Sequence, residues 1–315
     1  MKKIACIFPG QGAQYVGMAA DYIAGNARLK AVMKAFDQAH GTSLQSIMLQ
    51  GPEEALKETR FTQPAILFHS AAAYAALQDA IDFEPAFVAG HSLGEFSALV
   101  ANGTLTLPDA MHLVHKRGEF MMNANGDTPF GMAAIVGLTP QAVKEICVQA
   151  QDAGIVIAAN FNTPVQTVIS GSLAGVTKAS ELAKAAGAKR VIPLTVGGPF
   201  HSPLVQKAGT WLREEMENIN FATPTIPVVQ NVHAKPETDP KTIKENLVKQ
   251  VTSSVLWVDT MEFMLAQGIE LFIEFGPNRV LAGMMKKIDR KAKVLSIDTP
   301  ADVVAVKEYL EQNNG

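Results

Sequence analysis

The chain has 315 residues, of which 48% are hydrophobic and 18% are charged, so it can bury a large core in one large domain or in a large domain with a smaller companion. Its formal net charge of -3 gives no basic field, which argues against nucleic acid as a partner. Two cysteines lie in apolar runs without disulfide or metal-ligand spacing, and no apolar run approaches the roughly 18 residues that span a bilayer. We therefore expect a cytoplasmic globular protein with no membrane segment and no metal site.

The first 128 residues predict alternating strands and helices. A strand over 4–8 (IACIF) leads into a glycine-rich turn, and residues 62–78 (TQPAILFHSAAAYAALQ) predict a long apolar helix. A short strand follows at 87–89. Much later in the chain, the apolar run at 269–276 (IELFIEFG) predicts a further strand of the same large domain. Helices between successive strands favour a parallel sheet that is covered on both faces.

The stretch AFVAGHSLGEFSALVANGTL, residues 86–105, places Ser92 between Gly90 and Gly94 where an apolar strand turns into a helix. Glycines in these positions leave room for a sharp turn, which raises the serine hydroxyl at the carboxyl end of the strand. The alternative is a turn serine that caps the helix. Strand, turn and helix occur together here, so we favour Ser92 as a nucleophile, which requires a base and a group that stabilises the oxyanion.

Residues 129–196 follow a different order of elements, β-α-β-β-α-β. GMAAIVGL, IVIAANF, QTVISG and KRVIPLTV predict the four strands, PQAVKEICVQAQ and LAGVTKASELAKAAG predict the two helices, and a turn is expected at 162–164. This is the order of a ferredoxin-like unit, which we expect to be inserted between the two parts of a large domain, 1–128 and 197–315. Such an insertion creates a cleft between two bodies, where substrate sites tend to lie.

Seven histidines compete for the role of base. His201 stands out because it follows GGPF and begins a helix, predicted over 201–219, where the inserted unit returns to the large domain. His91 is adjacent to Ser92, but successive side chains at such a turn point apart. His112 and His115 lie three apart on a helix without a third metal ligand, so we expect them at the solvated surface.

Arg117 interrupts the apolar face of the helix predicted over 109–121. The apolar residues of that face follow helical spacing, and they are Ala110, Leu113, Val114 and Met121. A guanidinium that faces inward is costly unless it pairs with an anion. Spacing alone leaves two partners open: a structural pair with a glutamate such as Glu95, or the carboxylate of a substrate bound by two hydrogen bonds.

Five motifs occur in one order along the chain: FPGQGAQ (8–14), GHSLGE (90–95), HKRGEFM (115–121), GPFHSP (198–203) and FIEFGP (272–277). Together they closely resemble the malonyl-CoA:acyl carrier protein transacylase family. Further matches extend the resemblance over nearly the whole chain, and they are TQPAI (62–66), ANFNTP (159–164), VISGS (168–172), QNVHAKP (230–236) and VLAGMMKKI (280–288). Several motifs in order are far more specific than a lone G-x-S-x-G.

The resemblance implies an α/β-hydrolase-like large domain with an inserted ferredoxin-like small domain, which agrees with the predicted order of elements. It implies roles by position: Ser92 as nucleophile, His201 as base and Arg117 as the clamp for the malonyl carboxylate. The backbone N–H groups of Gln11 and Leu93 would form the oxyanion hole.

The resemblance also implies that a backbone carbonyl, that of Gln250 here, orients the catalytic histidine in place of a carboxylate. Phe200 matches the malonyl-type version of its motif, and with Met121 it is expected to shape the pocket against an α-methyl branch. The chain departs from the family at TSSVLW (252–257), where a proline and an arginine are common in place of Ser254 and Leu256. This departure lies in the loop that would orient the histidine.

The activity implied by the resemblance is transfer of malonyl from malonyl-CoA to the phosphopantetheine thiol of acyl carrier protein, through a malonyl-serine and with ping-pong kinetics. It would serve fatty acid or polyketide synthesis, without a cofactor, and we expect a monomer. Two alternatives are an acyl hydrolase of the same fold, which clears stalled acyl carrier proteins, and a carrier-binding scaffold with a vestigial site. A cation at 117 argues against the hydrolase, because neutral acyl groups do not need one.

The segment MKKIDRKAK (285–293) carries five basic residues. Acyl carrier proteins are strongly acidic, so a basic patch near the cleft would steer docking. An ordinary solvated helix face is the favoured alternative.

Overall fold

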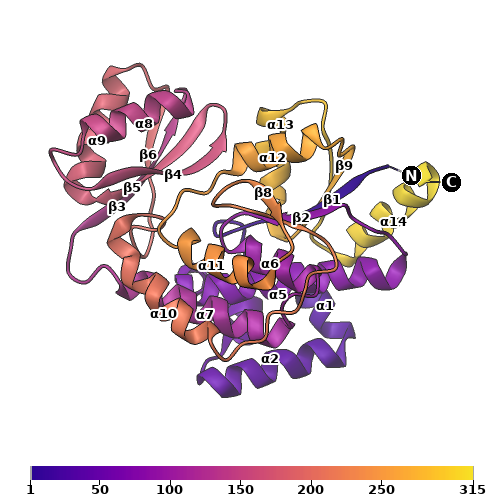
Figure 1. The fold of residues 1–315 in the computed structure, drawn as a ribbon. Coiled ribbons are helices and arrows are strands. Elements are labelled where there is room, and N and C mark those ends of the chain that lie inside the picture. The colour runs from indigo at the N-terminus through magenta and orange to yellow at the C-terminus, as the bar shows by residue number, and fades with distance from the viewer. Residues whose placement is uncertain (1, 315) are drawn as a thin grey trace.

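A six-stranded sheet forms the centre of the larger part of the protein in the computed structural model, which describes residues 2–314 (Figure 1). Its strands lie in the order β10-β9-β1-β2-β7-β8, and every neighbouring pair is parallel except β7 and β8. The bounds of these strands are β1 (Ile4–Phe8), β2 (Phe87–Gly90), β7 (Val228–Gln230), β8 (Lys235–Glu237), β9 (Leu271–Phe275) and β10 (Lys293–Ile297).

Alternate residues of the strands enter two different cores, so both faces of the large sheet are buried. On β1, Cys6 and Phe8 join the larger core, whereas Ala5 and Ile7 join the smaller one on the opposite face. The larger core is covered by α1 (Ala20–Gly25), α2 (Ala27–His40), α3 (Leu44–Gln50), α4 (Glu53–Lys57), α5 (Thr59–Ala80), α6 (Gly94–Ala101), α7 (Leu107–Asn123), α10 (Gln206–Met216), α11 (Pro240–Gln250) and α14 (Pro300–Asn314). The smaller core is covered by α12 (Trp257–Ala266) and α13 (Val280–Ile288).

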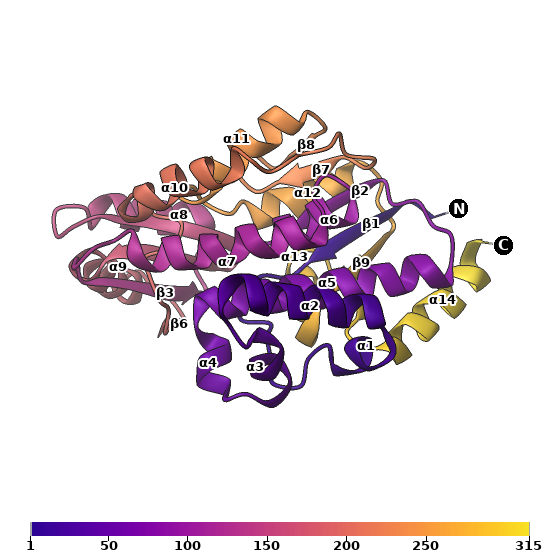
Figure 2. The same ribbon diagram turned by 90° about the horizontal axis from the view of Figure 1, so that it is seen from below.

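Figure 2 shows α2, α5 and α7 along the same side of the sheet, with α7 running toward the smaller part of the molecule. The predicted parallel sheet with both faces covered is therefore confirmed. The predicted apolar helix over 62–78 is also confirmed, since α5 spans Thr59–Ala80 and buries most of its length.

The second sheet is antiparallel and has four strands in the order β4-β5-β3-β6. Its elements follow the chain as β3 (Phe130–Val136), α8 (Pro140–Gln149), β4 (Val156–Thr163), β5 (Gln166–Ser172), α9 (Leu173–Ala185) and β6 (Arg190–Pro193). The first and third strands are central, which is the arrangement expected of a ferredoxin-like β-α-β-β-α-β unit. Figure 1 shows this unit beside the large sheet, with α8 and α9 on its outer face.

Three predicted boundaries differ from the structure. The predicted strand 189–196 pairs only over Arg190–Pro193, and the turn expected at 162–164 follows Thr163, because β4 continues to that residue. The helix predicted from His201 begins later, with a 3-10 turn at Pro203–Val205 and then α10 at Gln206. His201 itself has φ 59, a left-handed conformation that no right-handed helix contains.

The loop just before α12 is hydrogen-bonded directly to the small sheet. Val255 donates its N–H to the Ala159 carbonyl at 2.8 Å and accepts from the Phe161 N–H at 3.0 Å. Ser254, one of the two departures from the family pattern, donates its hydroxyl to the Ala158 carbonyl at 2.7 Å. Leu256, the other departure, packs against the core of the small sheet. The division into 1–128 with 197–315 and 129–196 stays a prediction.

The turn from β2 into α6 depends on two glycines that meet at close range. A Cβ on Gly90 would overlap the backbone of Gly94, and a Cβ on Gly94 would overlap the Phe8 carbonyl on the neighbouring strand. Only residues without a side chain allow this approach of helix to sheet.

Among residues 2–314, no helix is long and apolar enough to cross a membrane.

Gly94→Ala is expected to lower the free energy of unfolding by roughly 3 kcal/mol or more, because its methyl group has no space against β1. The matched control is Gly283→Ala on α13, where a Cβ meets nothing within 4 Å, and this change should be neutral or stabilising by up to about 1 kcal/mol. Urea unfolding of both variants measures the difference. Equal stabilities would contradict the proposed reason for glycine at 94.

Candidate active site

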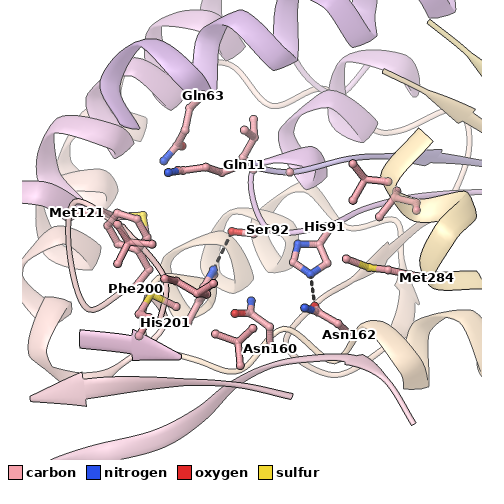
Figure 3. Close-up of a pocket in the computed structure, with 18 of the residues that line it drawn as sticks. Gln11, Gln63, His91, Ser92, Met121, Asn160, Asn162, Phe200, His201 and Met284 are labelled. Atoms are coloured by element: carbon pink, nitrogen blue, oxygen red, sulfur yellow. Dashed lines mark hydrogen bonds between the residues drawn. The ribbon is translucent and has the colours of Figure 1, made fainter. Parts of the chain in front are cut away.

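A cavity of about 200 Å³ lies where the large sheet meets the small one (Figure 3). Residues from both parts of the chain line it, and they include Gln11, Gln63, His91, Ser92, Leu93, Arg117, Met121, Met132, Asn160, Asn162, Phe200, His201 and Met284. Ser92, Arg117 and His201 therefore reach the same cavity, whereas Gln250 is outside its lining. The sequence separations are large, so the fold brings them together.

Ser92 lies at the turn between β2 and α6 with φ 51, a conformation that costs a residue with a side chain about 1–3 kcal/mol. Its Oγ is 2.8 Å from His201 Nε2 (Figure 3). The N-cap alternative finds no support, since α6 begins at Gly94 without a side-chain cap. The turn thus directs the hydroxyl toward a base and away from the helix end.

His201 is held by the Gln250 backbone carbonyl, which accepts from Nδ1 at 2.9 Å. Because a carbonyl oxygen only accepts, the Nδ1 atom carries the proton and Nε2 presents a lone pair to Ser92. Burial, followed by the positive charge of Arg117, lowers the pKa of His201 to about 3. The imidazole is therefore neutral at physiological pH and can accept a proton.

Arg117 is buried to 1% exposure, and three oxygen atoms accept hydrogen bonds from it. Nη1 donates to Gln63 Oε1 at 2.7 Å, and Nη2 donates to Gln250 Oε1 at 2.9 Å and to Ser92 Oγ at 3.0 Å. Within residues 2–314 it forms no ion pair, so the expected alternative of a direct pair with Glu95 is wrong. Burial lowers the pKa of Arg117 to about 10, which leaves it charged at neutral pH.

Glu95 is buried below the turn, where two donors meet its carboxylate. Gln230 Nε2 donates to Oε1 at 2.9 Å, and the Asn231 N–H donates to Oε2 at 2.8 Å. Burial raises the pKa of Glu95 to about 7, against the lowering effects of these hydrogen bonds and of the Arg117 charge. Glu95 thus belongs to the support of the turn and lies outside the cavity lining.

Gln11 and Leu93 line the cavity beside Ser92. In the described part of the chain, no hydrogen bond is recorded from the backbone N–H of either residue. Two free donors near the serine agree with the expected oxyanion hole. Phe200 and Met121 lie together on one wall of the cavity, in the position expected for residues that limit the acyl group (Figure 3).

The remaining histidines have other partners. His91 Nε2 lies 2.8 Å from Asn162 Oδ1 (Figure 3), and His112 Nε2 lies 2.6 Å from Glu215 Oε1. His115 is buried, with Nδ1 3.0 Å from the Arg60 carbonyl, so its expected place at the solvated surface is wrong. That helix face is covered by α2 and α5, which the spacing of α7 alone does not reveal. No cluster able to hold a metal ion is found in residues 2–314.

Sequence reasoning gave no role to three polar positions around the site. Gln63 contacts Arg117, Asn231 contacts the backbone of Ser92, and Asn160 lines the cavity. A signal existed for Gln63, because a glutamine in a helix buried along most of its length needs a polar partner. Asn231 follows a three-residue strand, and nothing in its local sequence indicates a partner 139 residues away.

Comparison with known proteins gives one consistent result. Residues 5–301 match the family described as the acyl transferase domain. The malonyl CoA-acyl carrier protein transacylase of Bacillus subtilis (strain 168) is 40% identical over 315 residues, which covers 100% of this chain and 99% of the relative.

Two solved structures are similar over nearly their whole lengths. The acyl-carrier-protein S-malonyltransferase of Burkholderia pseudomallei 1710b is 40% identical with a TM-score of 0.92, covering 97% of this chain and 99% of that one. A malonyl-transacylase solved in complex with its type II PKS acyl-carrier protein is 37% identical with a TM-score of 0.93, covering 98% of this chain and 99% of that one.

Glu95→Gln is expected to change how stability depends on pH. Burial raises the pKa of Glu95 from 4.5 to about 7, so between these values the folded protein holds a proton that the unfolded chain has lost. The free energy of unfolding should therefore fall by about 3 kcal/mol as pH rises from about 4.5 through 7, and the variant should lack this component.

Urea unfolding of the wild type and Glu95→Gln across this pH range measures the difference in slope. Glu181→Gln on α9 is the control, because it removes an exposed carboxylate of the same size. Parallel pH profiles of the wild type and Glu95→Gln would show that Glu95 titrates in the folded protein as it does in the unfolded chain.

Proposed function

This chain belongs to the acyl transferase domain family, and we propose that it transfers the malonyl group from malonyl-CoA to the phosphopantetheine thiol of an acyl carrier protein. The observation that supports this most directly is the convergence of three groups on one cavity. Ser92 Oγ lies 2.8 Å from His201 Nε2 and 3.0 Å from Arg117 Nη2. A nucleophile, a base and a buried cation together suit acyl transfer with an anionic acyl group.

The first half-reaction forms a malonyl-serine ester. Ser92 Oγ attacks the thioester carbonyl while His201 Nε2 takes the hydroxyl proton, and the N–H groups of Gln11 and Leu93 stabilise the oxyanion. The carbon–sulfur bond then breaks, and His201 returns the proton to the departing thiolate of coenzyme A. In the second half-reaction the carrier thiol attacks the ester in the reverse sense, which restores Ser92 and gives ping-pong kinetics.

During this cycle the Arg117 guanidinium can bind either the Ser92 hydroxyl or the malonyl carboxylate. In the resting site its Nη2 donates to Ser92 Oγ, which occupies an electron pair of the nucleophile. A malonyl carboxylate that binds the guanidinium replaces this contact and compensates the charge that lowers the pKa of His201. The serine becomes a better nucleophile and the histidine a stronger base when an anionic acyl group is present.

The size of the cavity limits what can bind inside it. About 200 Å³ is less than the roughly 300–1,000 Å³ of pockets that enclose drug-sized ligands, so the acyl group enters while most of coenzyme A stays outside. Phe200 and Met121 restrict the space next to the acyl group, which disfavours an α-methyl branch. The protein chain supplies all the chemistry in this scheme, without a cofactor.

The carrier protein docks, in this proposal, beside α13. Val280, Leu281 and Met284 of α13 line the cavity, and Lys286 and Lys287 are exposed at its carboxyl end. Arg290 and Lys291 are exposed in the turn that follows, so the basic segment is only partly helical. Its position near the cavity favours steering of an acidic carrier over a simple solvated helix face. We further propose that the enzyme is cytoplasmic and monomeric and that it serves fatty acid or polyketide synthesis.

Ser92→Ala should abolish the covalent intermediate. Wild-type protein mixed with malonyl-CoA should gain the mass of one malonyl group. The variant should gain none, because it lacks the hydroxyl that is hydrogen-bonded to His201 Nε2. Intact-protein mass spectrometry measures both. Release of the wild-type adduct to a carrier thiol supports transfer, whereas rapid release to water without transfer supports the acyl hydrolase. A malonyl adduct on Ser92→Ala would refute the assignment of the nucleophile.

Arg117→Ala should lower kcat/KM for malonyl-CoA by about 100-fold or more, because the variant lacks the partner of the malonyl carboxylate. It should raise the ratio of acetyl to malonyl transfer, because acetyl has no carboxylate to lose a partner and Nη2 no longer occupies Ser92 Oγ. Arg279→Ala is the control, since Arg279 is exposed and paired with Asp302. Steady-state rates with both acyl-CoAs measure the ratio. An unchanged acetyl-to-malonyl ratio in Arg117→Ala would remove Arg117 from the clamp role.

A further inference from the structure

We propose that Asn231 is the positioning residue of the nucleophile: its side-chain amide clamps both sides of the Ser92 turn and thereby sets the direction of the serine hydroxyl. The proposal rests on the proposed function only in taking Ser92 as the attacking group. Asn231 does not line the cavity, so it acts through Ser92 without contact to the acyl group.

The two ends of one amide hold opposite sides of the turn. Ser92 donates its backbone N–H to Asn231 Oδ1 at 2.7 Å, and Asn231 Nδ2 donates to the Gly90 carbonyl at 2.7 Å. The backbone N–H can only donate and the carbonyl can only accept, so these partners fix which end of the amide is oxygen. The clamp spans the turn from Gly90, two residues before the nucleophile, to Ser92 itself.

The turn needs such a clamp because Ser92 is held in a conformation it would otherwise leave. Ser92 has φ 51 and lies before the first residue of α6, so the helix supplies no acceptor for its N–H. A shift of Ser92 toward ordinary dihedral angles would turn Oγ away from His201 Nε2. Asn231 Oδ1 provides the acceptor that the helix lacks. This contact holds the turn in the conformation in which Ser92 Oγ reaches His201 Nε2.

Asn231 is itself fixed by buried groups on two other segments. The backbone N–H of Asn231 donates to the Glu95 carboxylate on α6 at 2.8 Å. The backbone carbonyl of Asn231 accepts from the Leu256 N–H at 3.1 Å. Gln250 Nε2 donates to the Ser92 carbonyl at 3.0 Å, which adds a third hold on the turn from α11. Asn231 is fully buried, so water does not replace any of these contacts.

Asn231→Asp provides a test with a built-in rescue. An ionised carboxylate still accepts from the Ser92 N–H, but it sets oxygen against oxygen at the Gly90 carbonyl. Protonation restores a donor there, and burial beside Glu95 raises the pKa of a carboxyl at this position. The charged and titratable groups around the clamp are Glu95 on α6, Arg117 on α7, His201, and His91 in the turn itself. Burial lowers the pKa of His91, which keeps that ring neutral. His201 stays neutral in this range, because burial and Arg117 hold its pKa at about 3.

The measurement is single-turnover formation of the malonyl-serine adduct with saturating malonyl-CoA, at several pH values between about 5.5 and 8, each rate divided by that of the wild type. Asn231→Ala should lower the rate constant about 100-fold, with little change in the malonyl-CoA concentration that gives half the maximal rate. Asn231→Asp should be equally slow at pH 8 and recover at least about tenfold at pH 5.5.

Asn246→Ala is the matched control, because Asn246 belongs to the same buried network but contacts Gln230 and His233 and not the turn. It should stay within about threefold of the wild-type rate at every pH, even where its thermal unfolding temperature falls.

Equal rates for Asn231→Ala and the wild type, a flat relative profile for Asn231→Asp, or an equal loss in Asn246→Ala would each overturn the proposal. If Asn231→Ala does not fold, the profile of Asn231→Asp alone decides. Absence of any adduct on the wild type would instead refute the proposed function, so the two failures are distinguishable.

Discussion

A buried cation that forms no ion pair with any residue from 2 to 314 determines the electrostatics of the cavity. Side-chain oxygens of Gln63 and Gln250 orient the guanidinium of Arg117, but neither amide carries a charge that would compensate it. Its field acts with burial to lower the pKa of His201, and it opposes the effect of burial on Glu95. A bound anion relieves this unfavourable state, so the resting site favours a negatively charged acyl group before any bond is made.

Ser92 and His201 are each held by a neutral amide group, one from a side chain and the other from the backbone. Ser92 and His201 both have positive φ, and neither belongs to the regular part of a helix or strand. Asn231 holds the first through its N–H, and the Gln250 carbonyl holds the second through its ring. Neutral amides can fix donors and acceptors in a buried place without adding charge that would compete with Arg117. Geometry and electrostatics of the site are therefore controlled by different groups.

Local patterns in the sequence predicted most of the fold and several of the side chains that meet at the cavity. The β-α-β-β-α-β order, the apolar helix over 62–78 and the glycines around Ser92 depend on near neighbours, and all are present in the structure. The parts that failed depend on distant packing. His115 is covered by helices that its own spacing does not reveal, and the neutral partners of Arg117 lie 54 and 133 residues away. Left-handed φ at His201 likewise has no signal in GPFHSP.

The backbone hydrogen bonds of Val255 attach the loop before α12 to β4 of the small sheet. Hydrophobic packing crosses the same boundary, since Val258 of α12 belongs to the core of the small sheet and Met132 of β3 belongs to the larger core. If either the large or the small part of the protein unfolded, the hydrophobic core of the other part would lose some of its residues. Heating should therefore produce one calorimetric transition for the whole chain, with equal van't Hoff and calorimetric enthalpies, although the topology divides it in two.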